Sequence, residues 1–411
     1  MKRPSGLTLI LGATGIAAVC GYLVIWFVPV QIGLAAYKPF GLFWAAMYLL
    51  VSALSGVQQE VTRATVPRSP SRAATANPAR NFGVALAGVV FVIVVASSPL
   101  WVDAVFPGEG FALVPPLAVA AASYVLVATL AGTLYGISGW VPLALMVAVD
   151  ALLRLVAVVA VAAVTSDTVT LAWAAATPFL LTIVLLWPAV RRGVVGRTWV
   201  DVGYRALSWN VTRTVAASAS MGLLVSGFPV LIGLASAGEQ AAFVASLFLA
   251  IMITRAPVIV LVMSLQSYLV VRFRDRRKEG FWRQFLLIQA AIAGGGVVLA
   301  VVAAFIGPAV FEWLYGSEFD LDGWFYAVLV VSSALVGALV VSAAAVLADS
   351  QHLVYSLGWL IAAAVTLGCF LLPADLLTRT VVALIAGPVA GLVVHGSHLL
   401  VRQGRVRQAA T

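Results

Sequence analysis

The chain has 411 residues, of which 63% are hydrophobic and only 9% charged, and its formal net charge is +9 at pH 7. Its mean hydropathy is +1.09. Apolar runs of roughly 20 residues, the length that crosses a ~30 Å hydrocarbon layer, recur along nearly the whole sequence. This composition excludes an ordinary soluble protein and predicts an integral membrane protein.

Twelve membrane-spanning helices are predicted, with short connections between them. They cover residues 7–29, 40–60, 82–102, 111–135, 140–164, 169–190, 207–234, 240–270, 285–311, 323–347, 353–373 and 378–400. The first apolar run continues past the length of a signal peptide and has no lipoprotein cleavage site at Cys20. It is therefore predicted to be an anchor and not a cleaved leader.

An internal repeat divides the chain into two halves. A shift of 200 residues aligns the first two spans with the seventh and eighth, and PVQIGLA (Pro29–Ala35) falls on PVLIGLA (Pro229–Ala235). Six spans separate the copies, so both enter the membrane in the same direction. The fold predicted is all-α, with two parallel six-helix lobes related by a pseudo-two-fold axis around a central cavity. The predicted parts are an N-terminal lobe (1–190), a basic linker (191–206), a C-terminal lobe (207–401) and a basic tail (402–411).

The basic residues predict the orientation. If the N-terminus is inside, the cytoplasmic segments hold Lys2, Arg3, Arg63, Arg68, Arg72, Arg80, Arg191, Arg192, Arg197, Arg205, Arg272, Arg274, Arg276, Arg277, Lys278, Arg283, Arg402, Arg405 and Arg407. The outer segments hold only Lys38 and Arg379 and are otherwise acidic. Both termini are therefore predicted to be cytoplasmic, in a bacterial inner (plasma) membrane. The net charge then reflects topology and contact with anionic lipids, and no nucleic-acid partner is expected.

The cysteines and histidines indicate neither a disulfide nor a metal site. Cys20 and Cys369 both lie in apolar spans, where free cysteine packs as a small hydrophobe. His352, His395 and His398 have no metal-ligand spacing and are predicted to be interfacial polar residues. We expect no metal and no cofactor.

Three arginines lie inside predicted spans, where a charge is costly unless it meets a partner, water or an anionic ligand. Arg154 is paired in sequence with Asp150 at i, i+4, so a self-neutralised pair is as good an interpretation as a ligand site. Arg213 lies near enough to the inner face to reach water. Arg255 lies near the middle of its span and is the strongest candidate. Because arginine binds phosphate oxygens in pairs, the three predict an anion-binding cavity.

Further candidates are polar residues near the inner face and prolines inside spans. The polar group that would line a cytoplasmic vestibule, with Asp150 as the coupling carboxylate, comprises Gln58, Gln59, Glu60, Arg63 and Gln266. Ordinary interfacial polarity is the alternative interpretation of these residues. Pro29, Pro229 and Pro257 are candidate gates or hinges, because proline frees a backbone carbonyl. Termination of the span is the alternative interpretation of Pro29 and Pro229.

These features together resemble the multidrug/oligosaccharidyl-lipid/polysaccharide exporter superfamily. The resemblance covers the full length and rests on the two six-span halves, on Gly33–Ala35 leading into a span that ends at Gln58–Arg63, and on the intramembrane arginines. The polysaccharide-biosynthesis branch, the O-antigen-type flippases, is the nearest match. The resemblance implies alternating access that moves a polyprenyl-diphosphate-linked sugar to the outer leaflet, with Arg154, Arg213 and Arg255 as diphosphate ligands by type and depth. Membrane lipids and polysaccharide-assembly enzymes are the other implied partners.

Two alternatives stay open. The first is a cation-coupled exporter of drugs or other small molecules. The resemblance implies that such exporters carry acidic residues in the first or seventh helix. Neither span has one here, so Asp150 is the only buried carboxylate predicted to be available for coupling to a cation. The second is a polyprenyl-dependent glycosyltransferase or polymerase, which generally needs a long outer loop carrying catalytic carboxylates. The only acidic cluster, between Glu312 and Asp322, fits a short connection, so an enzyme is not predicted.

Overall fold

The computed structural model describes residues 6–67, 77–275, 280–316, 319, 321–349 and 351–408. Within its helices, the side chains of residues 7, 256–268, 271, 274–275, 352 and 402–408 are outside this description. Several predicted topology residues therefore lie outside the described part, namely Lys2, Arg3, Arg68, Arg72, Arg276, Arg277, Lys278, Glu318 and Asp320.

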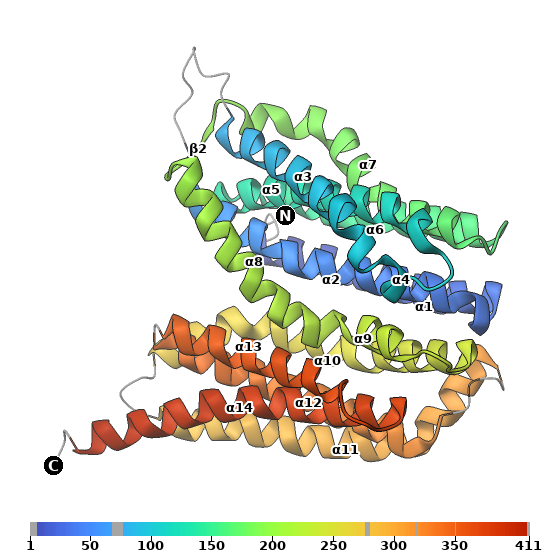
Figure 1. Ribbon diagram of the computed structural model, residues 1–411. Coiled ribbons are helices and arrows are strands. Elements are labelled where there is room, and N and C mark those ends of the chain that lie inside the picture. The colour runs from blue at the N-terminus through green and yellow to red at the C-terminus, as the bar shows by residue number, and fades with distance from the viewer. Residues whose placement is uncertain are drawn as a thin grey trace, which may run out of the picture. The chain divides into compact units, whose positions relative to one another are not determined.

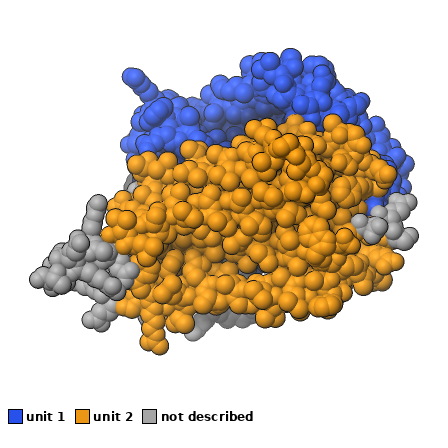
Figure 2. Space-filling view, turned by 60° about the horizontal axis from the view of Figure 1, so that its bottom comes forward, with its two compact units in different colours: residues 1–219 blue, residues 220–411 orange. Residues whose placement is uncertain are grey.

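The first of two compact units covers Met1–Ala219 (Figures 1 and 2). Its long helices are α1 (Gly6–Ile32), α2 (Leu34–Ala64), α3 (Pro78–Ser97), α5 (Val114–Gly136), α6 (Trp140–Ala162), α7 (Thr168–Val194) and the first part of α8 (Tyr204–Ser226). The short elements η1 (Ser98–Leu100), α4 (Val102–Val105) and η2 (Gly110–Leu113) connect α3 to α5. Strand β1 (Thr65–Pro67) pairs antiparallel with β2 (Thr198–Val200), with Val66 opposite Trp199.

The second unit covers Ser220–Thr411. It contains the end of α8, α9 (Phe228–Ala235), α10 (Ala241–Asp275), α11 (Phe281–Tyr315), α12 (Gly323–Ala348), α13 (His352–Cys369) and α14 (Leu376–Gln408) (Figure 1).

Each of the twelve predicted spans falls on a helix, the seventh on the bent pair α8–α9. Among the described residues, nine helices are long and apolar enough to cross a membrane, or ten if the bent pair is one span. The two remaining predicted spans correspond to shorter apolar helical stretches, Ala241–Arg255 in α10 and Leu353–Cys369 in α13. The predicted all-α membrane fold is confirmed.

The two units share the packing around their fourth and tenth spans, as the internal duplication predicts. In the first unit the fourth span, α5, contacts α2, α3 and α7, and α6 packs on α7. In the second unit the tenth span, α12, contacts α10, α11 and α14, and α13 packs on α14. These are the same pairings in span order. The central helices α5 and α12 are accordingly among the most buried of the spans.

The last helix of each half also begins with the same cap. Asp167 precedes α7 and Asp375 precedes α14, and each carboxylate accepts hydrogen bonds from the hydroxyl and the backbone N–H of a threonine three residues later, Thr170 and Thr378. These bonds satisfy an unpaired helical N–H. They also hold the pKa of both carboxyls below the usual range, so both caps stay ionised at neutral pH.

The division between the units lies inside α8, downstream of the predicted linker over 191–206. The physical reason is that the first part of α8 packs on the first unit. Leu207 and Val211 of α8 join one apolar cluster with Val57 and Val61 of α2. The helices approach closely at Gly56, where a Cβ would lie 2.5 Å from the backbone of Thr214 and Val215.

Gly56→Ala is expected to destabilise the protein by about 1–3 kcal/mol, because the added methyl group must push α8 away from α2. The unfolding midpoint of purified protein measures this effect. Gly12→Ala in α1 is the matched control, since nothing lies within 4 Å of the added Cβ there. Alanine is the better helix former at that position, so the control should be neutral or slightly stabilising. Equal midpoints for the two variants would contradict the close approach.

The predicted proline hinges occupy different local structures. Pro29 lies inside α1, which continues to Ile32. Pro229 lies in the first turn of α9, after a break at Gly227 where α8 and α9 differ in direction by 71°. The bend of the seventh span is therefore centred on Gly227 and precedes the proline.

Candidate functional site

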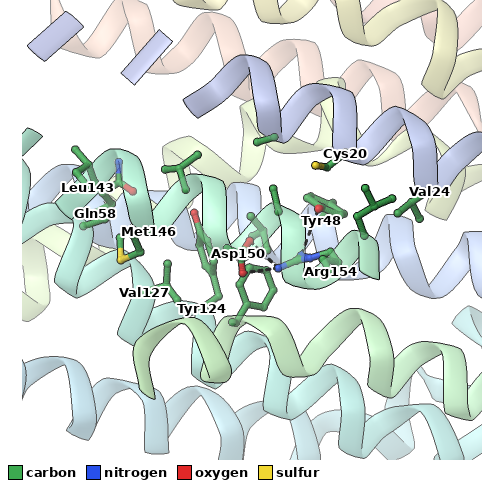
Figure 3. Close-up of a pocket in the computed structure, with 18 of the residues that line it drawn as sticks. Cys20, Val24, Tyr48, Gln58, Tyr124, Val127, Leu143, Met146, Asp150 and Arg154 are labelled. Carbon is green, nitrogen blue, oxygen red and sulfur yellow. Dashed lines mark hydrogen bonds and ion pairs between the residues drawn. The ribbon is translucent and has the colours of Figure 1, made fainter. Parts of the chain in front are cut away.

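A cavity of about 300 Å³ lies inside the first unit, among α1, α2, α5, α6 and α7 (Figure 3). Its polar residues come from three of these helices. They are Tyr48 and Gln58 of α2, Tyr124 and Tyr135 of α5, and Asp150 and Arg154 of α6. Cys20 and Val24 of α1, Trp44 of α2, Met146 of α6 and Phe179 of α7 are among the remaining wall residues.

Asp150 and Arg154 form an ion pair at the cavity wall. Nη2 of Arg154 donates to both carboxylate oxygens of Asp150 at 2.8 Å, and Nη1 donates to the hydroxyl of Tyr48 at 3.3 Å. The guanidinium carbon lies 4.0 Å from the ring centroid of Phe179, which adds a cation–π contact. Arg154 is only 3% exposed, and its Nε has no hydrogen-bond partner among the described residues.

This arrangement makes the cavity electrically neutral. The i, i+4 spacing brings the two side chains together on one face of α6, as the sequence predicts. The aromatic partners of Arg154 come from two other helices, α2 and α7. No local sequence pattern indicated these partners. The carboxylate of Asp150 is partly exposed to the cavity, and the neighbouring guanidinium group of Arg154 repels a cationic ligand that approaches it.

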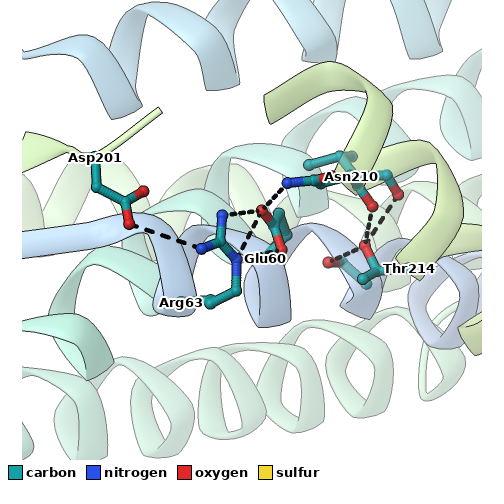
Figure 4. Close-up of polar contacts among 7 residues, drawn as sticks. Glu60, Arg63, Asp201, Asn210 and Thr214 are labelled. Atoms are coloured by element: carbon teal, nitrogen blue, oxygen red, sulfur yellow. Dashed lines mark hydrogen bonds and ion pairs between the residues drawn. The ribbon is translucent and has the colours of Figure 1, made fainter. Parts of the chain in front are cut away.

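Glu60 and Arg63 belong to a second polar group, between α2 and α8 (Figure 4). Glu60 is 5% exposed and accepts hydrogen bonds from Arg63 at 2.6 Å and from Nδ2 of Asn210 at 2.9 Å. Nη1 of Arg63 also lies 3.7 Å from Oδ2 of Asp201. Both side chains are exposed, so this ion pair contributes little to stability. Thr214 donates to the backbone oxygen of Gly56 at 3.0 Å. A buried carboxylate is thereby satisfied by both helices.

The predicted vestibule residues thus separate. Gln58 lines the cavity, while Gln59 donates to Ser218 at 3.2 Å and Glu60 faces Asn210, both on α8. The i, i+3 spacing of Glu60 and Arg63 was a signal for their pairing. Nothing in the sequence signalled Asn210 as the third member of this group.

Arg255 of α10 is buried in the second unit, at 1% exposure. Its Nη2 donates to the backbone oxygen of Leu224 at 3.0 Å, and its guanidinium carbon lies 4.7 Å from the ring centroid of Phe228. Leu224 is in the last turn of α8, just before the break at Gly227, so the cation stabilises the carbonyl end of that helix. Nε and Nη1 have no hydrogen-bond partner among the described residues.

The other predicted residues are placed as follows. Arg213 is exposed on α8. Pro257 and Gln266 lie within the bounds of α10, and their side chains are outside the described residues.

Solved structures with the same fold belong to one transporter superfamily. An inward-facing multidrug resistance MATE family transporter of the MOP superfamily matches 98% of this chain and 97% of its own, with a TM-score of 0.69 and 15% sequence identity. An outward-facing MATE structure matches with a TM-score of 0.61 at 15% identity, over 98% of this chain and 96% of its own. A MOP superfamily transporter from Pyrococcus furiosus, described by the reversed polarity of its binding pocket, matches with a TM-score of 0.62 at 16% identity, over 98% of this chain and 96% of its own. The chain is therefore a multi-pass membrane protein with the two-lobed fold of the MOP transporters.

No family model matches the sequence. The uncharacterized protein Rv3630 of Mycobacterium tuberculosis is 31% identical over 388 residues, which are 93% of this chain and 89% of that protein. The uncharacterized protein Mb3654 of Mycobacterium bovis matches to the same extent. A second M. tuberculosis protein, Rv1510, is 29% identical over 387 residues, with 93% of this chain and 89% of its own length covered. The chain belongs to the family of Rv3630 and Mb3654.

Proposed function

We propose that this protein is an alternating-access transporter that flips a polyprenyl-diphosphate-linked sugar, a precursor of cell-surface polysaccharide, from the cytoplasmic to the outer leaflet. The proposal makes it a transporter and not an enzyme. It also places both termini in the cytoplasm of a bacterial inner membrane, with membrane lipids and polysaccharide-assembly enzymes as partners.

The observation that carries the proposal is Arg255. A guanidinium group buried within a membrane span is expensive, and a single carbonyl contact leaves two of its nitrogens, Nε and Nη1, without partners. Among the described residues, no carboxylate lies within ion-pair distance of Arg255 or of Arg213. Since Asp150 neutralises Arg154, the buried Arg255 is left with an uncompensated positive charge, and this charge supports an anionic substrate such as a diphosphate.

A cation-coupled drug exporter is the second candidate, because the MATE structures with this fold are described as multidrug transporters. Such a mechanism needs a carboxylate that is free to exchange cations. Glu60 and Asp150 are the two acidic residues within the described spans that are not exposed, and both are held by arginines three or four residues away. This favours the flippase.

Ligand binding to purified protein in nanodiscs distinguishes the two. We expect polyprenyl diphosphate to bind, with an affinity that falls as salt is added, and a lipophilic cation such as tetraphenylphosphonium to bind far more weakly. Preferential binding of the cation would contradict the proposal and favour the exporter.

A further inference from the structure

The cavity of the first unit is lined by both aromatic rings and hydrogen-bonding groups. Neither a diphosphate nor a flat apolar molecule complements both kinds of group. Aromatic rings line it from three helices, including Trp44 and Tyr48 of α2, Tyr124 of α5 and Phe179 of α7. Polar groups share the wall with the rings: Tyr48, Tyr124 and the Asp150–Arg154 pair lie together, and Gln58 lies toward the other end, near Leu143 and Met146 (Figure 3). The cavity therefore combines apolar planes with hydrogen-bonding groups.

The charge of the cavity argues against an ionic ligand. Asp150 accepts both of its close contacts from Arg154, and Arg154 is enclosed by Asp150, Tyr48 and Phe179. A cation that approaches Asp150 is repelled by the guanidinium group, and an anion that approaches Arg154 is repelled by the carboxylate. A ligand without formal charge meets neither repulsion, and the carboxylate of Asp150, whose side chain is 21% exposed, can still accept hydrogen bonds from its hydroxyl groups.

The polar groups argue against an apolar ligand. Asp150, whose side chain is 21% exposed, lines the cavity together with Gln58 and the hydroxyl-bearing Tyr48 and Tyr124. An apolar molecule would remove water from these groups and replace none of the lost hydrogen bonds, which weakens binding. A ring that carries several hydroxyls replaces them.

The aromatic walls match the other property of such a ring. The C–H face of a pyranose is apolar and slightly positive, so it packs against the negative face of an aromatic ring. Tyr124 is only partly buried, and its ring is held edge-to-face against Phe179 at 5.3 Å between centroids. It is therefore a fixed platform at the cavity wall. A volume of about 300 Å³ is at the small end of ligand cavities and suits a single sugar ring better than a long chain.

We propose that this cavity binds one uncharged sugar ring of the lipid-linked substrate, stacked on Tyr124 and hydrogen-bonded by Asp150 and Gln58. Arg154 acts as a positioning residue that fixes Asp150 and Tyr48. The inference rests on the proposed function and adds to it the part of the substrate that this cavity recognises, an uncharged hexose and not the diphosphate.

The test compares two lipids on the full chain in nanodiscs: a polyprenyl diphosphate that carries one neutral hexose and the same lipid without sugar. For the wild type we expect the hexose-bearing lipid to bind about tenfold more tightly, the factor that a well-placed aromatic contact supplies. Tyr124→Leu should remove this preference, measured as the ratio of the two affinities in the same variant, while Tyr124→Phe should keep most of it.

Gln58→Leu, on another helix, is the second variant, and it should reduce the preference even if Tyr124→Leu folds poorly. Trp209→Leu is the control, because Trp209 is 64% exposed on α8 and is not part of the cavity wall. Equal binding of both lipids to the wild type would overturn the inference and leave the flippase proposal standing. A preference that survives in both Tyr124→Leu and Gln58→Leu would also overturn it. Binding of neither lipid would overturn both proposals.

Discussion

Asp150→Asn is expected to destabilise the protein by about 3 kcal/mol or more, because it leaves Arg154 charged, buried and without its carboxylate. Arg154→Gln should cost less. The reason is that an isolated carboxyl can take up a proton and become neutral, whereas a guanidinium group stays charged. The double variant Asp150→Asn/Arg154→Gln removes both charges and should be more stable than Asp150→Asn alone.

Unfolding midpoints of the four proteins in one detergent measure this double-mutant cycle, and the sign of the coupling is its critical result. If the loss of stability in the double variant equals the sum of the losses in the two single variants, the two side chains do not interact as described. Asp167→Asn is the control for removal of a carboxylate, because Asp167 lies at an exposed helix start and Asn also caps helices well.

Arg255→Met is expected to lower both stability and diphosphate binding. The substitution keeps an extended side chain in the buried site, so its main effect is the loss of a charged hydrogen bond to Leu224, worth about 1.5–3 kcal/mol. The carbonyl end of α8 then lacks a donor next to the bend at Gly227. Loss of the two unpartnered nitrogens should weaken binding of polyprenyl diphosphate about tenfold or more.

Arg255→Lys separates these two roles. Lysine keeps a charge for the Leu224 carbonyl but has no planar fork for two phosphate oxygens. We therefore expect Arg255→Lys to recover stability more than diphosphate affinity. Arg192→Met, at an exposed position near the end of α7, should leave both quantities unchanged. A stable Arg255→Met protein with wild-type diphosphate affinity would remove Arg255 from both roles.

The sequence predicts well what depends on short stretches of chain. Apolar runs of about 20 residues predict twelve segments that all fall on helices, nine or ten of which are, among the described residues, long and apolar enough to cross a membrane. The i, i+4 spacing likewise predicts that Asp150 meets Arg154. The repeat predicts two six-span halves, and the matching contacts of α5 and α12 agree with it.

What the sequence leaves open depends on packing between distant segments. Tyr48, Tyr124 and Phe179 surround the Asp150–Arg154 pair only because α2, α5 and α7 pack around α6. The partner of Glu60 on α8 is 150 residues away along the chain. The seventh span bends by 71° at Gly227, two residues before the proline that suggested a hinge.

The measurement that tests the central claim most directly is lipid movement in proteoliposomes that contain the purified protein. A fluorescent polyprenyl-diphosphate sugar is placed in both leaflets, and a membrane-impermeant quencher is added outside. The account predicts that fluorescence is lost from both leaflets in vesicles with wild-type protein and from the outer leaflet alone in protein-free vesicles, with slower loss for Arg255→Met. The account would be contradicted if the inner-leaflet lipid stayed fluorescent in vesicles with wild-type protein and the protein instead took up a lipophilic cation driven by a proton or sodium gradient.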